Sequence, residues 1–344
     1  MQIYDLVPDL RPTILAARQV RDARNTLERF LPVRAVNDVS YRLGRKRRMD
    51  QTVPVRAIDA PATPIRRPGV VDVKGDLPAV TPIVNLTEDD LTREMIMARQ
   101  LNGLAVDWQD PVDDGATQVA LAADNTFELM RGQVLSTGTI SLVADDGDLH
   151  SVDFGVPGGQ IITAASAWNG AGSGNVFKDF DAAHEVFAAA YGNGAGIALT
   201  TRRVAATMLN AVQALFPNSP VGQNELSAYL ANRGLPQIVT YDRVLVSATG
   251  ARSRVYPEGT ITFLPGDEDP VGRTELGITQ EAVQQVTRRQ PNGGTALLAN
   301  EVAGLTIVTL GQDNPVQRAV KGAAIGMPVL ADTDAITVLK GVLS

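Results

Sequence analysis

The stretch from Asp110 to Gly155 constrains the fold of this chain more than any other part of the sequence. Asp110 suits the cap of a helix and Pro111 suits its first position, because proline lacks the amide hydrogen that this position would leave unbonded. Apolar residues then recur at steps of three and four, which places them on one side of a helix: Val112, Ala116, Val119, Ala123, Phe127 and Met130. Arg131 and Gly132 supply a basic last turn and a stop signal. The sequence thus predicts a helix over about residues 110–131, roughly 30 Å long.

Two strand-like runs follow the predicted helix, at Gln133–Val143 and Leu149–Phe154. Between them, Asp145-Asp146-Gly147-Asp148 is typical of a hairpin turn, because glycine accepts the positive φ that such turns need. The helix is therefore expected to lead into a β-hairpin that closes on Val152-Asp153-Phe154-Gly155.

The composition restricts the chemistry that the chain can perform. Its 344 residues contain no cysteine, which excludes disulfides, zinc–thiolate sites and thiol nucleophiles. No apolar run of about 18 residues occurs, so no membrane-spanning segment is expected. Residues Met1–Asp5 lack the basic-then-apolar pattern of a signal peptide. We therefore expect a soluble, non-secreted protein that makes no contact with a membrane.

Charge is distributed unevenly along the chain. The net charge is −7, yet residues 1–67 hold 14 Arg and Lys against 7 Asp and Glu, so the remainder carries −14. A basic arm on an acidic body could bind nucleic acid, or it could lie on the acidic body of a neighbouring copy. The arm has little of the aromatic interleaving that is typical of single-strand binders, which favours the second interpretation.

Residues 41–86 differ in character from the rest and contain six prolines. Proline removes backbone donors and forces the residue before it into extended geometry, and the valines here alternate as they do in strands. A segment of this length and make-up cannot build a compact core of its own. We therefore expect an ordered, extended arm whose apolar side rests on another subunit. Deleting Arg45–Pro82 should then leave a folded body that cannot form particles.

Eleven residues are predicted to form contacts between subunits. They are basic and alternating apolar residues of the arm, together with one aromatic residue that precedes it: Phe30, Arg45, Lys46, Arg47, Arg48, Val53, Val55, Arg66, Arg67, Val71 and Val73. The cluster Arg45–Arg48 is also typical of a nucleic-acid patch, so a weak, non-specific contact with nucleic acid stays open as an alternative for it.

The rest of the sequence indicates an α+β fold. A thin amphipathic helix is expected at Leu10–Phe30, and Thr87 with Asp90 three residues later approximates a capping box before another helix. His184 shares an apolar helix face with phenylalanines, which is typical of a packing residue, and the glycine-rich run Gly192–Gly196 indicates a domain boundary. Helices are expected at Asp179–Tyr191, Thr201–Phe216 and Asn224–Asn232. Strands are expected at Ile238–Ser247, Arg254–Leu264 and Gly304–Leu310, and the C-terminal segment Pro315–Leu339 is expected to complete a buried sheet.

The known sequence motifs of catalytic, nucleotide-binding and calcium-binding sites do not fit this chain. The run Gly192–Gly196 follows a helix, whereas a phosphate-binding loop follows a strand. Asp153-Phe154-Gly155 matches a kinase triplet, but neither histidine begins a His-Arg-Asp loop. No Gly-x-Ser-x-Gly occurs, and the acidic runs near Asp145 and Asp267 lack calcium-loop spacing. The sequence predicts no catalytic, cofactor-binding or metal-binding residue, and hence no enzyme.

Four features in this order and spacing resemble one known family. They are Ala79-Val80-Thr81-Pro82, the helix end Leu129-Met130-Arg131-Gly132, the hairpin end Val152-Asp153-Phe154-Gly155, and Ile325-Gly326-Met327-Pro328-Val329 with Asp332–Leu339. With the helix and hairpin that they flank, they resemble the lambda-type major capsid proteins of tailed bacteriophages, the phage capsid protein E family.

The resemblance implies a Hong Kong 97-type capsid fold. By this likeness, residues 1–40 form an N-terminal arm and residues 41–86 an extended loop that lies across a neighbour. Residues 87–192 form a peripheral domain with a long spine helix, residues 193–326 an axial domain, and residues 327–344 a C-terminal strand that returns to the peripheral domain.

The same resemblance implies that the chain assembles, in the bacterial cytoplasm, through hexamers and pentamers into the icosahedral shell around double-stranded DNA. The implied partners are other copies, portal and scaffold proteins, a decoration protein in some relatives, and packaged DNA by weak non-specific contact. Two alternatives stay open at this stage. One is an encapsulin-like cellular cargo shell of the same fold, and the other is a monomeric α+β binding protein.

Overall fold

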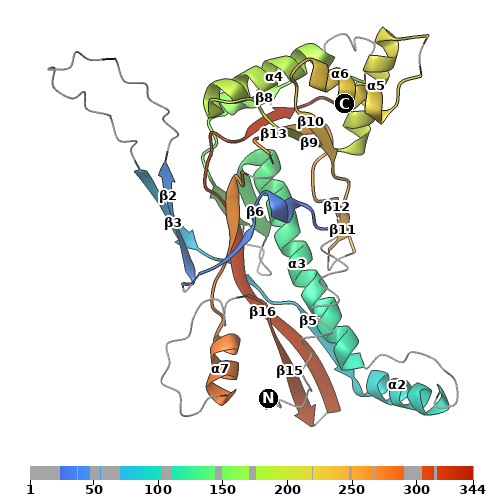
Figure 1. The fold of residues 1–344 in the computed structure, drawn as a ribbon. Helices are drawn as coiled ribbons and strands as arrows, with labels where there is room; N and C mark the ends of the chain where they lie inside the picture. Colours follow the sequence, from blue (N-terminus) through green and yellow to red (C-terminus); the bar gives the residue numbers. More distant parts are fainter. Residues whose placement is uncertain are drawn as a thin grey trace.

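The computed structural model describes residues 24–36, 38–46, 55, 70–101, 111–143, 149–169, 176–218, 220–247, 250–266, 269–289, 304–313 and 316–343. Over these ranges the chain forms an elongated body (Figure 1). Helix α3 (Pro111–Thr137) runs along the body between a sheet at each end, and a thin hairpin leaves it at one side.

The described helices are η1 (Leu27–Arg29, 3₁₀), α2 (Glu88–Leu101), α3 (Pro111–Thr137), η2 (Gly158–Gln160, 3₁₀), α4 (Val176–Tyr191), α5 (Arg202–Leu215), α6 (Gln223–Asn232) and α7 (Gln280–Arg289). The described strands are β1 (Val33–Ala35), β2 (Ser40–Lys46), β3 (Val70–Asp76), β4 (Ala79–Val80), β5 (Ile83–Thr87), β6 (Thr139–Val143), β7 (Leu149–Asp153), β8 (Ile161–Thr163), β9 (Ile197–Thr200), β10 (Gln237–Thr240), β11 (Val244–Val246), β12 (Arg252–Arg254), β13 (Thr260–Leu264), β14 (Gly272–Leu276), β15 (Thr306–Asp313), β16 (Val316–Leu330) and β17 (Thr337–Lys340).

The long strand β16 organises the first sheet, which has six strands in the described part of the chain. The first half of β16 lies between β15 and β5, and its second half pairs with β4 and then with β14. Strand β1 adds to the far side of β14 in parallel. Because β1, β4 and β5 come from the front of the chain and β14 to β16 from its end, this sheet joins both ends of the sequence.

Helix α3 packs on this sheet through the apolar stripe that the sequence predicts. Val112, Ala116 and Val119 are buried against Val320 of β16. Farther along the helix, Phe127 and Met130 of the stripe enter the main core, together with Val134 and Leu135, which lie beyond the predicted helix. The predicted stripe is therefore confirmed.

The predicted end of this helix is wrong. Helix α3 continues past Gly132 to Thr137, and it ends at Gly138, whose φ of 71° is the left-handed conformation that glycine accepts without strain. Gly132 is instead a point of close approach, because a Cβ there would lie 2.1 Å from the carbonyl oxygen of Val255. The residues Gln133–Thr137 are thus helical, and the strand that follows begins only at Thr139.

The second sheet has five strands within the described residues, in the order β10-β9-β13-β17-β8. Helices α4, α5 and α6 lie around it at the upper end of the molecule in Figure 1. Phe180 of α4 packs on Phe263 of β13 with ring centroids 4.9 Å apart. Strand β13 is buried at every position, as expected for a central strand covered on both faces.

His184 is a packing residue, as predicted. It is half-buried on α4, and its Nε2 accepts a hydrogen bond of 3.1 Å from the amide of Ala195. Burial lowers the pKa of its ring, which keeps Nε2 free of a proton and able to accept this bond.

Two short-range predictions are confirmed. Strands β6 and β7 form the expected hairpin from Thr139↔Asp153 onward, with its turn outside the described residues. At the start of α2, the Asp90 carboxylate accepts the Thr87 amide at 3.1 Å, and the Thr87 hydroxyl accepts the Asp90 amide at 3.4 Å. This is the reciprocal pattern of a capping box.

The expected helix at Leu10–Phe30 is wrong over its described part, where residues 24–30 form a turn and the short 3₁₀ helix η1.

The expected strands Ile238–Ser247 and Arg254–Leu264 each split into two, because the chain turns away from the second sheet to form the separate hairpin β11–β12. The run Gly192–Gly196 is no domain boundary, since it joins α4 to β9 of the sheet on which α4 packs.

Each sheet combines strands from more than one of the expected domains. Strands β14 and β15 and most of β16 fall in the range expected to be axial, and they share a sheet with β1, β4 and β5 beside α3. Strand β17, expected to return to the peripheral domain, lies between β13 of the expected axial range and β8 of the expected peripheral range. Pairing between segments far apart in the chain, rather than position in the chain, decides which body a strand joins.

Candidate inter-subunit surface

The hairpin of β2 and β3 projects from the body (Figure 1). Its strands pair in register from Ser40↔Asp76 to Lys46↔Val70, and within the described part of the chain they pair only with each other. An isolated two-stranded hairpin is at best marginally stable in water. A surface outside the hairpin is therefore needed to hold its outer part in place.

The root of the hairpin is fixed to its own subunit. Tyr41 and Leu77 are buried, and the amide of Leu77 donates a hydrogen bond of 2.9 Å to the carbonyl of Val39. Burial raises the pKa of the Tyr41 hydroxyl, with the charges of Asp76 and Glu275 adding to the effect. The hydroxyl therefore stays protonated at any ordinary pH, and the root remains a fixed base for the hairpin.

The residues after the hairpin also stay with their own subunit. Ala79 and Val80 pair with β16, the amide of Gly322 donates to the Pro82 carbonyl at 2.8 Å, and Ile83–Thr87 forms β5. The expected extended loop, residues 41–86, is therefore too long at its end. A deletion of Arg45–Pro82 would remove β4, a strand of the subunit's own sheet, so from the structure we expect this deletion to destabilise the body.

Ten of the eleven predicted contact residues fall in three groups. Arg45 and Lys46 lie on β2, and Val71 and Val73 lie on β3, with Arg45 paired to Val71. Val55 is fully exposed. The positions of Arg47, Arg48, Val53, Arg66 and Arg67 lie outside the described residues.

Phe30 does not fit the predicted set. Its side chain is 1% exposed and belongs to the core of its own subunit, with the guanidinium of Arg29 4.5 Å above its ring. A side-chain contact with a neighbour is not open to it in this conformation. The interpretation that the basic arm, residues 1–67, lies on a neighbouring copy does not hold for residues 24–36, since η1 and β1 pack on the body of their own subunit.

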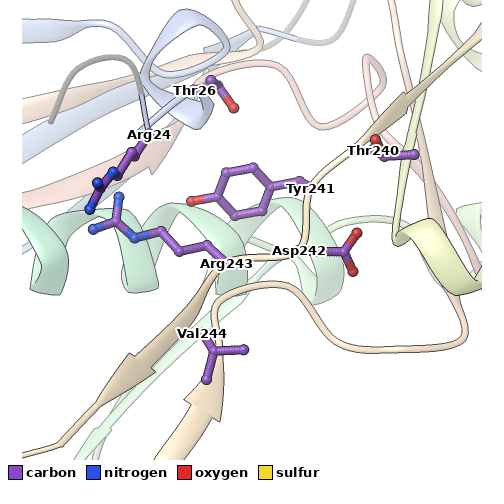
Figure 2. A pocket seen from close by; sticks show the side chains of 7 residues that line it. All are labelled: Arg24, Thr26, Thr240, Tyr241, Asp242, Arg243 and Val244. Atoms are coloured by element: carbon purple, nitrogen blue, oxygen red, sulfur yellow. The ribbon is translucent and has the colours of Figure 1, made fainter. Parts of the chain in front are cut away.

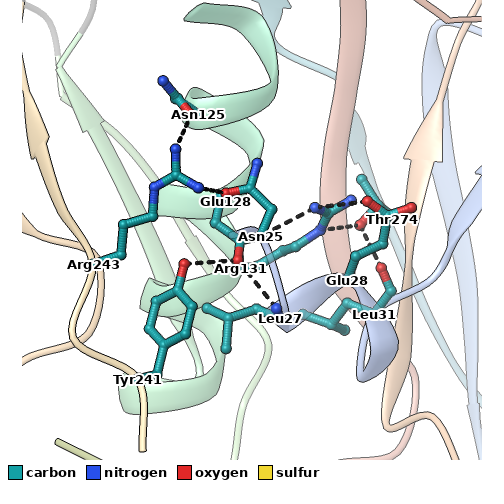
Figure 3. A network of polar contacts seen from close by, with 10 residues as sticks. All are labelled: Asn25, Leu27, Glu28, Leu31, Asn125, Glu128, Arg131, Tyr241, Arg243 and Thr274. Atoms are coloured by element: carbon teal, nitrogen blue, oxygen red, sulfur yellow. Dashed lines mark hydrogen bonds and ion pairs between the residues drawn. The ribbon is translucent and has the colours of Figure 1, made fainter. Parts of the chain in front are cut away.

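A buried ion pair on α3 holds residues 24–36, the front segment, in place (Figure 3). Arg131 and Glu128 are 3.2 Å apart, and both side chains are almost completely buried. Arg131 also lies 3.3 Å from Glu28 and donates to the Thr274 hydroxyl at 3.1 Å. The amide of Leu27 donates to the Glu128 carboxylate at 3.1 Å.

The same network reaches the second sheet. The Tyr241 hydroxyl, in the loop after β10, donates to Glu128 at 2.8 Å. Arg243 in that loop donates to the side-chain oxygens of Asn25 and Asn125 (Figure 3). The network therefore ties the base of the front segment, the middle of α3 and the start of β11 together.

Sequence reasoning missed this network. The only local signal is a Glu–Arg pair at spacing i, i+3 next to Phe127 and Met130, which places two charges beside a buried stripe. Buried charges are rarely left unpaired, so the pattern predicts partners but does not identify them.

An open cavity of about 480 Å³ adjoins the network (Figure 2). Residues of the front segment and of the loop between β10 and β11 line it: Arg24, Thr26, Thr240, Tyr241, Asp242, Arg243 and Val244. Burial, reinforced by the Glu128 charge, raises the pKa of the Tyr241 hydroxyl far above its ordinary value, so this hydroxyl cannot serve as a base or nucleophile near neutral pH.

Catalytic chemistry gains no support from the described residues. Among them, no group of three or more histidine and carboxylate side chains is placed to hold a metal ion. None of the described helices is long and apolar enough to cross a bilayer.

Comparison with known proteins identifies the family. The family model described as phage major capsid protein E matches residues 32–335. No curated protein sequence matches the chain.

Solved structures match over nearly the whole length. A protein described as a prophage capsid protein from E. coli CFT073 is 10% identical, covers 97% of this chain and 98% of its own, and has a TM-score of 0.58. A phage-related protein from Bordetella bronchiseptica RB50 is 13% identical over 96% and 97%, with a TM-score of 0.57. The capsid of cyanophage A-1(L) is 11% identical over 93% of each chain, with a TM-score of 0.53. At these identities the likeness is one of fold.

The fold is thus the α+β capsid fold of the Hong Kong 97 type. The match to the family model spans most of the chain, including α3, the six-stranded sheet and all strands of the five-stranded sheet except β17. This chain therefore belongs to the phage major capsid protein E family, and it is a structural protein of the virion, the subunit that builds the icosahedral shell of a tailed bacteriophage.

Proposed function

We propose that the β2–β3 hairpin of each subunit lies across a neighbouring copy, and that this contact helps to close subunits into the hexamers and pentamers of the shell. The supporting observation is a hairpin with a buried root and no strand partner other than itself in the described part of the chain. Heterologous contacts of this kind, in which one surface meets a different surface of the next copy, close into rings.

Charge supports the same arrangement. Residues 40–76 hold nine Arg and Lys against four Asp and Glu, a balance of +5, so the remaining chain carries −12. A basic projection and an acidic body attract each other when they belong to neighbouring copies, and this attraction steers association. Of the predicted contacts we keep Arg45, Lys46, Arg47, Arg48, Val53, Val55, Arg66, Arg67, Val71 and Val73, and leave out Phe30.

The two sheets take different places in this proposal. The six-stranded sheet with α2 and α3 would be the peripheral domain, which lies toward the outside of each ring. The five-stranded sheet with α4, α5 and α6 would be the axial domain, whose loops meet at the ring centre. Helix α3, whose ends lie near the two sheets in Figure 1, would be the spine between them.

Further partners are proposed from family membership. They are portal and scaffold proteins, and a decoration protein on the finished shell. The basic residues of the hairpin segment would also make weak, non-specific contacts with packaged DNA, and these contacts should weaken as salt releases the counterions of the phosphates.

A shortened hairpin tests the proposal. Residues 44–72 are replaced by Asn-Gly, which joins the paired positions Leu43 and Val73 through a two-residue turn of the favoured type. The buried root and all later strands are retained, so the subunit should unfold at the same temperature as wild type. Electron microscopy and sizing chromatography should then show folded subunits but no shells. Shells formed at the wild-type yield would contradict the proposal.

A further inference from the structure

The cavity next to β11 carries an excess of positive charge. The half-buried guanidinium of Arg243 is bonded to the amide oxygens of Asn25 and Asn125, which are neutral. Arg24 is exposed and forms no ion pair within the described residues. Figure 2 shows both guanidinium groups extending toward the same side of the cavity. Two like charges that share a cavity repel each other, and an anion between them would relieve this repulsion.

The single acidic side chain of the cavity is already occupied. The Asp242 carboxylate lies 3.3 Å from the Arg254 guanidinium, and it accepts the amide of Arg202 at 2.8 Å. It therefore does not neutralise Arg24 or Arg243. The two guanidinium groups, of Arg24 and Arg243, therefore favour an anionic ligand in this cavity.

The rim of the cavity is apolar on the side of β11. Val244, which lines the cavity, is 46% exposed, and Val246, two residues farther along β11, is 63% exposed. Nucleic-acid sites instead present extended basic stripes that follow the phosphate backbone. Protein interfaces combine an apolar centre with charged groups that fix orientation. A charged cavity with an apolar rim fits a protein partner better than DNA.

We propose that this cavity, named here the arginine cavity, binds a carboxylate side chain of a second copy of the chain. The proposal rests on the proposed function, because the shell surrounds each subunit with copies of itself. Outside residues 40–76 every copy carries −12, so carboxylates are available on its body. A guanidinium binds a carboxylate through paired, charge-assisted hydrogen bonds, and that geometry would fix the orientation of the neighbour.

Crosslinking from the cavity tests the identity of the occupant. Thr26 lines the cavity and is exposed, and the chain contains no cysteine, so Thr26→Cys offers a single site for a benzophenone maleimide. Shells are assembled from an equal mixture of ¹⁴N- and ¹⁵N-labelled subunits, checked by electron microscopy, and irradiated. We expect crosslinked peptides of mixed isotope in which the partner peptide contains Asp or Glu. Crosslinks confined to one copy, or to DNA in filled particles, would overturn the inference while leaving the shell itself established.

Charge reversal at Arg24 tests whether the arginine cavity binds an anion. Arg24→Glu should raise the critical concentration for assembly about tenfold, which corresponds to about 1.4 kcal/mol per contact, and Arg24→Gln should have a smaller effect. Because Arg24 is exposed, the subunit itself should keep its unfolding temperature. Arg318→Glu, at the far end of β16, makes the same change in net charge and should stay within twofold of wild type. Equal effects of the two reversals, or no effect of Arg24→Glu, would refute the arginine cavity as an anion site.

Discussion

The hydroxyl of Tyr241 donates a hydrogen bond of 2.8 Å to the carboxylate of Glu128, which joins the loop after β10 to the middle of α3. Burial, with the Glu128 charge as a second cause, raises the pKa of this hydroxyl far above its ordinary value. The hydroxyl therefore keeps its proton near neutral pH and acts as the donor of this bond. One bond thus links the five-stranded sheet to the helix that packs on the six-stranded sheet.

Removal of this hydroxyl should show how much its hydrogen bond to Glu128 contributes to the stability of the subunit. Tyr241→Phe leaves the ring in place but deprives a buried carboxylate of one donor, so we expect the free energy of unfolding to fall by about 1–3 kcal/mol. Urea unfolding followed by circular dichroism provides the measurement. Tyr229→Phe is the control, because that hydroxyl accepts a hydrogen bond from an exposed arginine, Arg233, and should change stability by less than about 0.5 kcal/mol. Equal losses of unfolding free energy for the two substitutions would show that the bond to Glu128 contributes no more to stability than an exposed hydrogen bond.

The buried ion pair should show strong coupling. Arg131→Met leaves the Glu128 carboxylate buried without its cation, and we expect this single change to cost about 3–5 kcal/mol. Adding Glu128→Leu removes the uncompensated charge as well, so the double variant should be more stable than the sum of the two single changes implies. A double-mutant cycle in urea measures the difference. Simple additivity would mean that the two side chains contribute independently.

A methyl group at Gly132 should destabilise the subunit. Alanine would favour the helix by about 1 kcal/mol, but its Cβ would lie 2.1 Å from the Val255 carbonyl oxygen, so the backbones would have to separate. We expect a net loss of about 1–3 kcal/mol, typical of overpacking. Gly158→Ala is the control, since nothing lies within 4 Å of a Cβ there. A Gly132→Ala variant that unfolds at the wild-type temperature would contradict the close packing of α3 on this segment.

His184 should make stability depend on pH in a defined window. Burial lowers its pKa, so the unfolded chain binds a proton more strongly than the folded one. The stability that the neutral ring contributes is complete above the ordinary histidine pKa of about 6.5, and it is lost as the pH falls through the lower, folded value. Unfolding measured from pH 7.5 to pH 5 should therefore show a steeper loss for wild type than for His184→Gln. Parallel curves would mean that His184 does not titrate differently on folding.

Local features could be predicted from the sequence because their causes are local. The Thr87–Asp90 cap, the β6–β7 hairpin and helices α4, α5 and α6 all follow from spacing and turn residues within a short window. The end of α3 could not, because Gly132 looks like a stop signal until the approach of Val255 is known.

Long-range features were beyond such reasoning. Nothing near Ala79 or Val84 indicates that these residues pair with β16 near the other end of the chain. For the same reason the sequence does not indicate that β14 to β16 share a sheet with β1, β4 and β5. The partners of Glu128, Leu27 and Tyr241 among them, come from segments on either side of α3 in sequence, and only the fold brings them together.

Strand β16 has a mechanical consequence. Its 15 residues are paired in succession with β15, β5, β4 and β14 and span roughly 50 Å at the usual rise per residue. Bending it at any point would break ladder hydrogen bonds to a neighbour and disturb the face on which α3 lies. This half of the subunit should consequently behave as a stiff lever, so that a displacement imposed near α2 is transmitted to the opposite end rather than absorbed along the way.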